Sequence, residues 1–531
     1  MTRKTLLPFV AGLCALATFA SPVQAQANRN NLTILGDIDA DRYDPHRTAA
    51  RAAGEVLYLL TDTLVSLDYD QKTVLPGLAT SWTVSTDGKL YTFKLRDDVT
   101  FCDGRKMTAD DVVYSIKRWT DPATRSPVRW RAGDIKELRA PDPLTVEYEL
   151  NQPNSELLYQ LSLFFAGVID KNDVEKLGQD FGVKGLNGTG PYCWVSWEPR
   201  NAFVMKRNPA YKWGPPIYKN RGPAHIEQIT RKVVGEDSTR LNALLSGQGD
   251  LTQSVPYFAL EQARKARNLQ LVQAQNAFNL WFIGFKVDKP LMQDVRVRRA
   301  INMAVDQKAL AETQFFGVAR PAKTYIDPAA LDYNKAAESL IPAYDPEGAK
   351  RLLDEAGWKV GSDGFRYKDG VKLAPLTYAI AGLWNKYMEA VQGDLRKVGI
   401  DLQIQLFDAT IAWGKLATQE FDAFGMSFPY FSAGDAMNLY FRSGNAPTPN
   451  RMNWKDAETD RLLDEGRAAL TADVRSAAYG AVQKRVLEES VWLPLVHDAL
   501  YIAATNRLEG VKAHGIYNVA LYKGLDLQFK K

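Results

Sequence analysis

One strand–helix–strand order in the second half of the chain constrains the fold more than any other feature. Residues 376–381 have the composition of a strand, and residues 385–398 have that of a helix that ends at Gly399. Residues 400–406 then alternate apolar and polar side chains. A helix between two strands of one sheet makes those strands parallel, because antiparallel neighbours need only a short turn. The sequence therefore predicts an α/β protein with a parallel sheet in its second half.

The first half of the chain is richer in predicted strands. Residues 31–36 are expected to form a strand, and residues 55–67 a helix with one apolar face. Residues 82–84 and 90–95 alternate on either side of Asp87-Gly88, which predicts a hairpin because this dipeptide accepts positive φ. The two halves are thus expected to be two unlike α/β lobes.

Helix starts are marked at several positions. Thr108 and Asp111 have the spacing of a capping box that opens a helix at residues 109–119. Asp345-Pro346 predicts a second helix start, with Gly357 just past the end of that helix. Further expected elements are strands at residues 145–150 and 192–197 and a helix at residues 294–305.

The first 25 residues have the pattern of a secretory signal peptide. Arg3 and Lys4 precede an apolar stretch at residues 6–20, and small residues follow up to Ala25. The apolar stretch is too short to cross a bilayer as a folded helix, which disfavours a retained membrane anchor. We expect residues 1–25 to be cleaved and the mature protein to be periplasmic.

Charge and cysteine content limit the partners and the compartment expected for this protein. Removing residues 1–25 takes two basic residues from the 66 Lys and Arg, which leaves 64 against 62 Asp and Glu. Charges of both signs are interspersed, so no nucleic-acid partner is expected. Cys102 and Cys193 remain after cleavage. An oxidising compartment permits a disulfide between them, and two buried free thiols are the alternative.

The sequence lacks the usual motifs of catalysis. Its four histidines are in no HExxH or Cys/His metal spacing, and no GxSxG motif is present. Paired carboxylates such as Asp110-Asp111 lie in the first turn of a predicted helix, where capping explains them. We therefore expect no catalytic residue, no metal and no cofactor, and a secreted hydrolase is kept only as the least favoured alternative.

Motifs in a fixed order over most of the chain carry a family resemblance. They are SW at residues 81–82, YTFKLR at 91–96, VTFCDG at 99–104, TADDV at 108–112, GTGPY at 188–192, RNPAY at 207–211, DVRVRRAI at 294–301, YDPE at 344–347 and LLDEAGW at 352–358. Together they resemble the family 5 extracellular solute-binding proteins, which are oligopeptide- and dipeptide-type receptors of bacterial ABC importers.

This resemblance implies a fold and a role. The implied fold is the two-lobed periplasmic-binding-protein fold of the large, cluster C type, with a ligand cleft between the lobes. Lobe I would comprise residues 28–275, with an inserted subdomain at about residues 76–185. Lobe II would comprise residues 276–499, and residues 500–531 would return to lobe I. The protein would be a monomer that captures its ligand by hinge closure and delivers it to a membrane permease with ATPase subunits.

The resemblance also implies a ligand class, with a short peptide as the first expectation. Peptide receptors hold the ligand's α-amino group with an acid in the loop after a Phe-Asp strand, here near Pro429, and the nearest acid is Asp435. An oligosaccharide, an opine-like compound or a metal chelate therefore stays an alternative. The loop positions around residues 48–51 and in both lobes give these candidate ligand-binding residues: Arg51, Trp130, Trp384, Asn385, Phe428, Tyr430 and Asp435.

Overall fold

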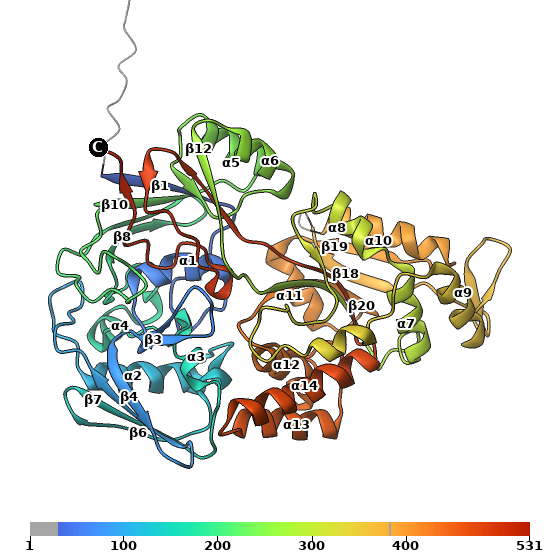
Figure 1. Cartoon of the computed structure of the whole chain (residues 1–531), viewed down its shortest axis with the longest axis horizontal. Coiled ribbons are helices and arrows are strands. Elements are labelled where there is room, and N and C mark those ends of the chain that lie inside the picture. Colours follow the sequence, from blue (N-terminus) through green and yellow to red (C-terminus); the bar gives the residue numbers. More distant parts are fainter. Residues whose placement is uncertain (1–29, 382–383) are drawn as a thin grey trace, which may run out of the picture.

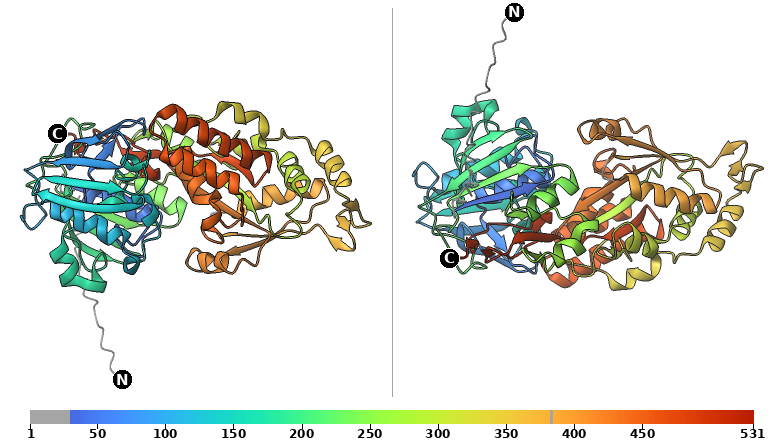
Figure 2. Two further views of the ribbon diagram at one scale, coloured as in Figure 1. Left: turned by 90° about the horizontal axis from the view of Figure 1, so that it is seen from below. Right: turned by 90° about the horizontal axis from the view of Figure 1, so that it is seen from above.

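The protein consists of two lobes that lie side by side along its longest axis (Figures 1 and 2). The computed structural model describes residues 30–381 and 384–531, so the predicted signal peptide at residues 1–25 lies outside the described residues. Within these ranges, no helix combines the length and the hydropathy that a membrane crossing requires.

Lobe I is built on a seven-stranded sheet with the order β12-β22-β11-β1-β10-β9-β8. Strand β1 is parallel to β10 and β11, whereas β9, β8 and β22 are antiparallel to their neighbours. Its strands are β1 (Asn31–Gly36), β8 (Tyr192–Glu198), β9 (Ala202–Arg207), β10 (Gln228–Val233), β11 (Leu251–Thr252), β12 (Leu269–Gln273) and β22 (Tyr501–Thr505). The helices α1 (Arg51–Leu60), α5 (Asp237–Leu245) and α6 (Leu260–Lys265) pack against this sheet.

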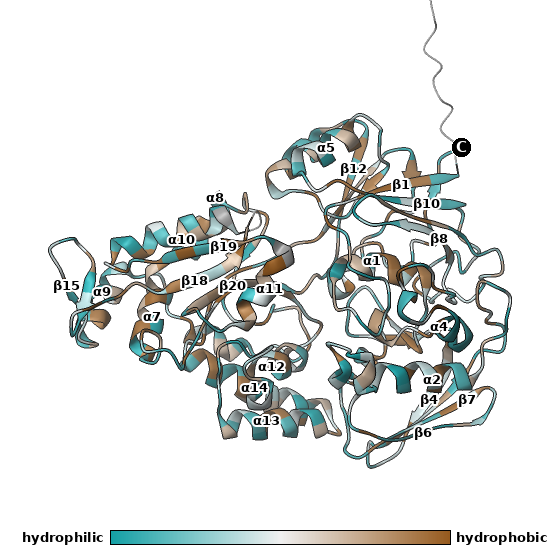
Figure 3. Cartoon of the chain, turned by 180° about the vertical axis from the view of Figure 1, so that it is seen from behind, coloured by the Kyte–Doolittle hydropathy of each residue, from teal (hydrophilic) through white to brown (hydrophobic). Residues whose placement is uncertain are grey.

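A second, four-stranded sheet with the order β4-β5-β7-β6 completes lobe I. Gly88 has φ +69° between the first two of these strands, so the predicted hairpin is confirmed. The elements of this part are β4 (Ala79–Val84), β5 (Leu90–Leu95), α2 (Ala109–Thr120), β6 (Ile135–Asp142), β7 (Thr145–Leu150), α3 (Leu157–Gln160) and α4 (Lys171–Leu177). Figure 3 shows mainly hydrophilic residues on α4, which has no buried residue.

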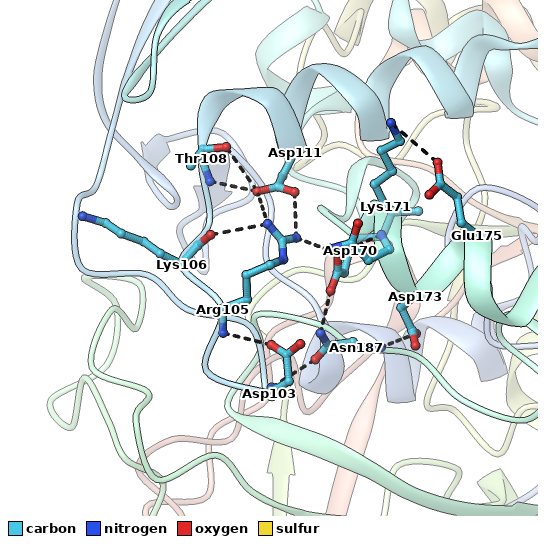
Figure 4. Close-up of polar contacts among 12 residues, drawn as sticks. Asp103, Arg105, Lys106, Thr108, Asp111, Asp170, Lys171, Asp173, Glu175 and Asn187 are labelled. Carbon is cyan, nitrogen blue, oxygen red and sulfur yellow. Dashed lines mark hydrogen bonds and ion pairs between the residues drawn. The ribbon is translucent and has the colours of Figure 1, made fainter.

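The start of α2 is fixed by a polar network (Figure 4). The Asp111 carboxylate accepts a hydrogen bond from the Thr108 backbone N–H at 2.9 Å, which confirms the predicted capping box. Arg105 forms ion pairs with Asp111 at 2.7 Å and with Asp170 at 2.6 Å. The Asn187 amide donates to Asp170 at 2.8 Å. The network therefore ties three segments of lobe I together beside the start of this helix.

Cys102 and Cys193 form a disulfide in lobe I, with their Cα atoms 5.8 Å apart. Cys193 lies in β8, and Cys102 lies in the loop that precedes the capping box. The bond links the four-stranded part of lobe I to an edge strand of its larger sheet.

Lobe II is built on a six-stranded sheet with the order β14-β21-β13-β20-β18-β19. Strands β18 and β19 are parallel, with Leu376 opposite Gln403, and α10 (Asn385–Lys397) connects them, which confirms the predicted strand–helix–strand unit. The strands are β13 (Asn279–Phe285), β14 (Arg320–Pro321), β18 (Leu376–Ile380), β19 (Gln403–Phe407), β20 (Ala423–Pro429) and β21 (Trp492–His497).

Helices cover both faces of the lobe II sheet, and the alternation along β13 shows why. Leu280 and Phe282 point into one hydrophobic cluster, and Trp281 and Ile283 point into another on the opposite face. The helices α12 (Ala433–Phe441), α13 (Ala457–Ala468) and α14 (Ala472–Glu488) contribute to the first cluster. The helices α7 (Val295–Ala304), α8 (Gln307–Thr313), α9 (Pro346–Glu355) and α10 contribute to the second.

The remaining elements lie outside the seven-, six- and four-stranded sheets. The predicted start of α9 is confirmed, because the Asp345 carboxylate accepts from the Gly348 N–H at 2.8 Å. Other elements are α11 (Ala409–Ala417), β15 (Lys359–Val360), β16 (Arg366–Lys368), β17 (Val371–Lys372), β23 (Leu508–Glu509) and β24 (Gln528–Phe529).

One predicted helix is partly wrong. Residues 55–67 were expected to be helical throughout, but α1 ends at Leu60 and β2 (Val65–Leu67) follows. The strand pairs with β3 (Val74–Pro76), and Val65 and Leu67 are fully buried. A short apolar run that is buried on every side looks alike in a helix and in a strand, so only the partner strand decides between them.

The chain crosses between the lobes twice. It runs from β12 in the lobe I sheet to β13 in the lobe II sheet, and it returns from β21 to β22. A hollow of about 310 Å³ is lined by both crossing segments, including Gln275, Phe278, Asp498 and Leu500. The division at residues 275/276 and 499/500, and the inserted subdomain at about residues 76–185, stay predictions.

Candidate functional site between the lobes

A buried ion pair joins the two lobes. Arg131 lies in a short 3-10 helix of lobe I (Arg129–Ala132), and Asp435 lies in the first turn of α12 in lobe II. Arg131 Nη1 pairs with Asp435 Oδ1, and both side chains have an exposed fraction of 0%. Arg131 Nη1 also donates to Gln160 Oε1 at 2.8 Å. Burial is the main influence on Asp435 and raises its pKa, while Arg131 and Gln160 act in the opposite direction.

Part of this ion pair has unused hydrogen-bonding capacity. Arg131 Nε and Nη2, Asp435 Oδ2 and Trp130 Nε1 are buried and have no hydrogen-bond partner within the part of the chain that the structure describes. A buried polar group without a partner costs about 1–3 kcal/mol, and more when the group is charged. The packed interface therefore encloses polar atoms whose burial is not compensated by hydrogen bonds.

Glu156 provides a second polar contact between the lobes, next to the ion pair. It directly precedes α3 and accepts from Ser432 Oγ at 2.5 Å and from Tyr479 Oη at 3.3 Å, both in lobe II. The pKa of Glu156 is raised to about 7, mainly by burial; the Ser432 hydrogen bond opposes this shift and the nearby Asp435 adds to it. Ser432 also accepts from the Asp435 N–H at 2.9 Å, so one hydroxyl caps α12 and bonds lobe I.

The lobes exchange aromatic side chains around these polar groups. Phe431 of lobe II stacks on Tyr159 of lobe I with ring centroids 5.6 Å apart, and it belongs to the lobe I core cluster. Trp130 of lobe I packs against the lobe II cluster, and the Arg131 guanidinium lies 4.8 Å from its ring. Aromatic rings thus surround the buried charges and exclude water from them.

A separate polar cluster lies at the crossing segments. Asp498 Oδ2 accepts from Asn279 Nδ2 at 3.0 Å and from Trp281 Nε1 at 3.2 Å, and Asp498 Oδ1 accepts from the Tyr257 hydroxyl. Tyr257 comes from lobe I, whereas Asn279 and Trp281 lie on β13 of lobe II. This cluster therefore links the lobes at the hollow beside the two crossings.

The structure brings two of the predicted site residues together. Trp130 and Asp435 meet through Arg131, which contacts both. Arg51 lies elsewhere, where it forms ion pairs with Asp37 at 2.6 Å and with Glu55, so protein carboxylates already occupy it.

Three of the other predicted residues are buried in the core of lobe II, and the side chain of the fourth is not described. Trp384 is buried against Trp281, with ring centroids 5.2 Å apart. Phe428 packs on Tyr440 at 4.7 Å. The Tyr430 hydroxyl accepts from the Asp327 N–H at 2.6 Å. Asn385 begins α10, but its side chain is outside the described residues. A ligand-binding role for any of these residues stays a prediction.

Residue patterns missed several members of this interface. Arg131 gave no signal beyond its position next to Trp130, and Ser432 resembles any helix cap. Glu156 had a weak signal, because it precedes a largely apolar run at residues 157–168, where a carboxylate is costly. The missed residues are Arg131, Glu156, Gln160, Ser432 and Tyr479.

The carboxylates of the interface contact protein side chains and do not form a metal site within the described residues. Among residues 30–381 and 384–531, no three His, Cys, Asp or Glu side chains lie together in a way that could hold a metal ion. Asp435 and Glu156 contact a guanidinium and two hydroxyls instead.

Comparison with known proteins gives matches along nearly the whole chain. The sequence model of a family described as "Bacterial extracellular solute-binding proteins, family 5 Middle" matches residues 73–448. The glutathione-binding protein GsiB of Escherichia coli (strain K12) is 28% identical over 514 residues, which cover 95% of this chain and 94% of that protein.

Solved structures share the fold. The oligopeptide-binding protein AppA of Bacillus subtilis, in complex with a nonapeptide, has a TM-score of 0.83 at 22% identity and covers 94% of this chain and 99% of its own. The binding protein AgaA of A. tumefaciens R10, in complex with agropinic acid, has a TM-score of 0.81 at 23% identity, with coverage of 94% and 99%. At these identities the likeness concerns the two-lobed architecture, which agrees with the predicted fold class.

Proposed function

Since the chain belongs to the bacterial extracellular solute-binding proteins of family 5, we propose that it is the periplasmic substrate-binding component of an ABC importer for short peptides or peptide-like solutes. The observation that carries this proposal is the buried polar interface between two lobes that two chain crossings connect within the described residues. Such an interface can open and close about a ligand without unfolding either lobe.

The interface chemistry supports a peptide-like ligand. Asp435 offers a carboxylate oxygen, Arg131 offers two N–H groups, and Trp130 offers an aromatic surface. Peptides carry ammonium, carboxylate and amide groups that complement these side chains. The relatives are consistent with this assignment, since one binds glutathione and a structural neighbour binds a nonapeptide.

The mechanism follows from differential contacts. A ligand that bonds to Arg131 in lobe I and to Asp435 in lobe II gains both sets of contacts only when the lobes are closed. It therefore shifts the equilibrium toward the closed form by that difference in binding free energy. The closed, loaded form would dock on the membrane permease, and the ATPase subunits would supply the energy for transport. The ligand would leave chemically unchanged.

A non-peptide solute is the second candidate. Pro429 ends β20 where peptide receptors are expected to hold the ligand's α-amino group with an acid. Structural neighbours include complexes with agropinic acid and with Ni(L-His). An opine-like compound or a metal chelate would keep the importer-receptor role and change only the cargo. A hydrolase would instead release a product.

Identification of the bound solute tests the proposal. The mature protein is purified without denaturation, co-purifying molecules are identified by native mass spectrometry, and each is checked by thermal shift. A ligand at 100 times its Kd stabilises the protein by about 2.7 kcal/mol, which is readily detected. Recovery of intact short peptides supports the proposal. Recovery of an amine-free sugar or chelate overturns the peptide assignment, and steady turnover of a bound peptide overturns the receptor role.

A further inference from the structure

Three arginines line a hollow on the surface of lobe I, which we call the arginine hollow. It has a volume of about 400 Å³, and its lining includes Arg47, Arg118 and Arg125. Arg47 lies in the loop before α1, Arg118 in the last turn of α2, and Arg125 directly after a short 3-10 helix (Pro122–Thr124). None of the described residues that line the hollow is acidic, and all of them belong to lobe I. The hollow therefore does not depend on whether the two lobes are open or closed.

Arg118 is held firmly at the edge of the hollow. Its Nη2 donates to Asp44 Oδ2 at 2.6 Å and its Nη1 donates to Asp44 Oδ1 at 2.9 Å. The guanidinium carbon lies 5.2 Å from the centre of the Phe181 ring. Two parallel hydrogen bonds and an aromatic face fix the orientation of a guanidinium. Asp44 thus neutralises one of the three positive charges and holds that arginine in place.

The other two arginines are not neutralised. Arg47 Nη1 donates to a neutral group, Gln179 Oε1, at 3.3 Å. Arg125 is exposed and has φ +57°, a conformation that is unfavourable for a residue with a Cβ. Of the three arginines, only Arg118 has a carboxylate partner within the part of the chain that the structure describes. Two guanidinium groups at the hollow are therefore left without a counterion.

Like charges crowd around Arg47. Its pKa is lowered by burial and by the neighbouring Arg42, Arg118 and Arg125, whereas Asp44 acts in the opposite direction. The C-terminal ends of α2 and α4 offset part of this charge, since each carries up to about half a negative charge. With two arginines unpaired, about one positive charge remains without a counterpart in the protein. An anion would supply that counterpart.

We propose that the arginine hollow binds a phosphate monoester group, either on a soluble compound or on a lipid headgroup. Such a group carries about two negative charges near neutral pH and three terminal oxygens, so it can accept hydrogen bonds from several guanidinium groups at once. A carboxylate has only two oxygens and one charge. The Thr124 hydroxyl and the Gln179 amide line the same hollow and add neutral hydrogen-bonding groups. This site is separate from the interface between the lobes.

Inorganic phosphate and vesicles of defined composition test the proposal with the mature protein. Isothermal titration calorimetry at pH 8 and low ionic strength is expected to show saturable binding of phosphate, about tenfold tighter than that of acetate, because one more charged hydrogen bond forms. Low ionic strength is needed because salt screens exposed charges. Co-sedimentation with phosphatidylcholine vesicles that contain phosphatidic acid, a lipid with a phosphate monoester, is the second arm. Binding of phosphate alone assigns a soluble compound, and binding of these vesicles assigns a headgroup.

Variants locate the effect. Arg47→Gln/Arg125→Gln should weaken phosphate binding about tenfold, since two charged partners are lost. Arg264→Gln/Arg351→Gln is the matched control, because it changes the net charge equally at side chains that are 58% and 69% exposed. Circular dichroism verifies folding. Arg125→Gln alone, at an exposed side chain, should weaken binding about threefold and serves if the double variant does not fold.

The outcomes are distinct from those of the proposed receptor function. Absence of saturable phosphate binding together with absence of vesicle binding overturns the site. Equal losses in the two double variants also overturn it, because the attraction then reflects net charge alone. Acetate that binds as tightly as phosphate overturns the choice of phosphate. None of these results alters the receptor proposal, since no residue of lobe II lines the hollow.

Discussion

Arg131 of lobe I and Asp435 of lobe II form an ion pair in which neither side chain has any exposed surface. The two residues are 304 positions apart in the sequence. Because each residue belongs to a different lobe, the hinge opening that we propose would break this contact. The free energy of this pair therefore belongs to the open–closed equilibrium as well as to folding.

Removing one partner of this pair should open the protein. Asp435→Asn leaves Arg131 buried without a countercharge, a change that costs about 3–5 kcal/mol in the closed form. Small-angle X-ray scattering without ligand should show a larger radius of gyration than for the unaltered protein. Asp464→Asn is the control, because Asp464 is 67% exposed in its ion pair with Arg442. An unchanged radius for Asp435→Asn would mean that the pair does not hold the lobes together.

Glu156 should make stability depend on pH. Its pKa is about 7 in the folded protein against an ordinary 4.5, so the folded state binds more protons than the unfolded state between these values. The free energy of unfolding should fall by about 3 kcal/mol as pH rises through this window. Urea denaturation at pH 5 and pH 7.5 measures most of this change, and Glu156→Gln should remove the contribution of this carboxyl.

The difference between the unaltered protein and Glu156→Gln isolates this carboxyl. His497 and His514 have pKa values lowered by burial to about 4, so their contribution rises with pH and has the opposite sign. Both histidines are present in the two proteins and cancel in the difference. Identical pH profiles would show that Glu156 titrates alike in the folded and unfolded states, which contradicts the prediction.

A methyl group at Gly434 should disturb the interface. A Cβ there would lie 2.3 Å from Glu156 Oε1 and 2.4 Å from the Tyr479 ring, which is too close for both. Gly434→Ala should weaken ligand binding at least about tenfold and lower the Tm, although alanine favours a helix by about 1 kcal/mol. Gly444→Ala is the matched control, because its Cβ would meet nothing within 4 Å. Equal ligand affinities of the two variants would contradict a role for Gly434 in ligand binding.

The disulfide should stabilise lobe I. Cys102 and Cys193 close a loop of 91 residues, and the chain-entropy model assigns about 4–5 kcal/mol to a loop of this length. The double variant Cys102→Ser/Cys193→Ser should therefore unfold at lower urea concentration and bind ligand with little change once folded. Treatment of the unaltered protein with dithiothreitol should reproduce the shift. No effect of dithiothreitol on the double variant provides the control.

Local sequence patterns are sufficient to predict much of the fold without any tertiary contact. The Thr108–Asp111 capping box and the Asp87-Gly88 hairpin act over a few residues, so their physics is complete in the sequence. The order of strand, helix and strand at residues 376–406 required a parallel pair, which β18 and β19 form. The helix expected at residues 61–67 was wrong because the pairing of β2 with β3 overrides a helical pattern.

Only the tertiary structure decided which side chains face one another across the lobes. The sequence predicted Trp130 and Asp435 as candidates, but it gave no reason to join Arg131 to Asp435 or Glu156 to Ser432. Those contacts depend on how two separately packed cores meet. The paired residues are far apart in the sequence, so no local pattern links them. Arg51 illustrates the same limit, since it was available to a ligand carboxylate by pattern yet pairs with Asp37 and Glu55. Burial and charge compensation are set by the packed neighbours, and these exist only in the folded chain.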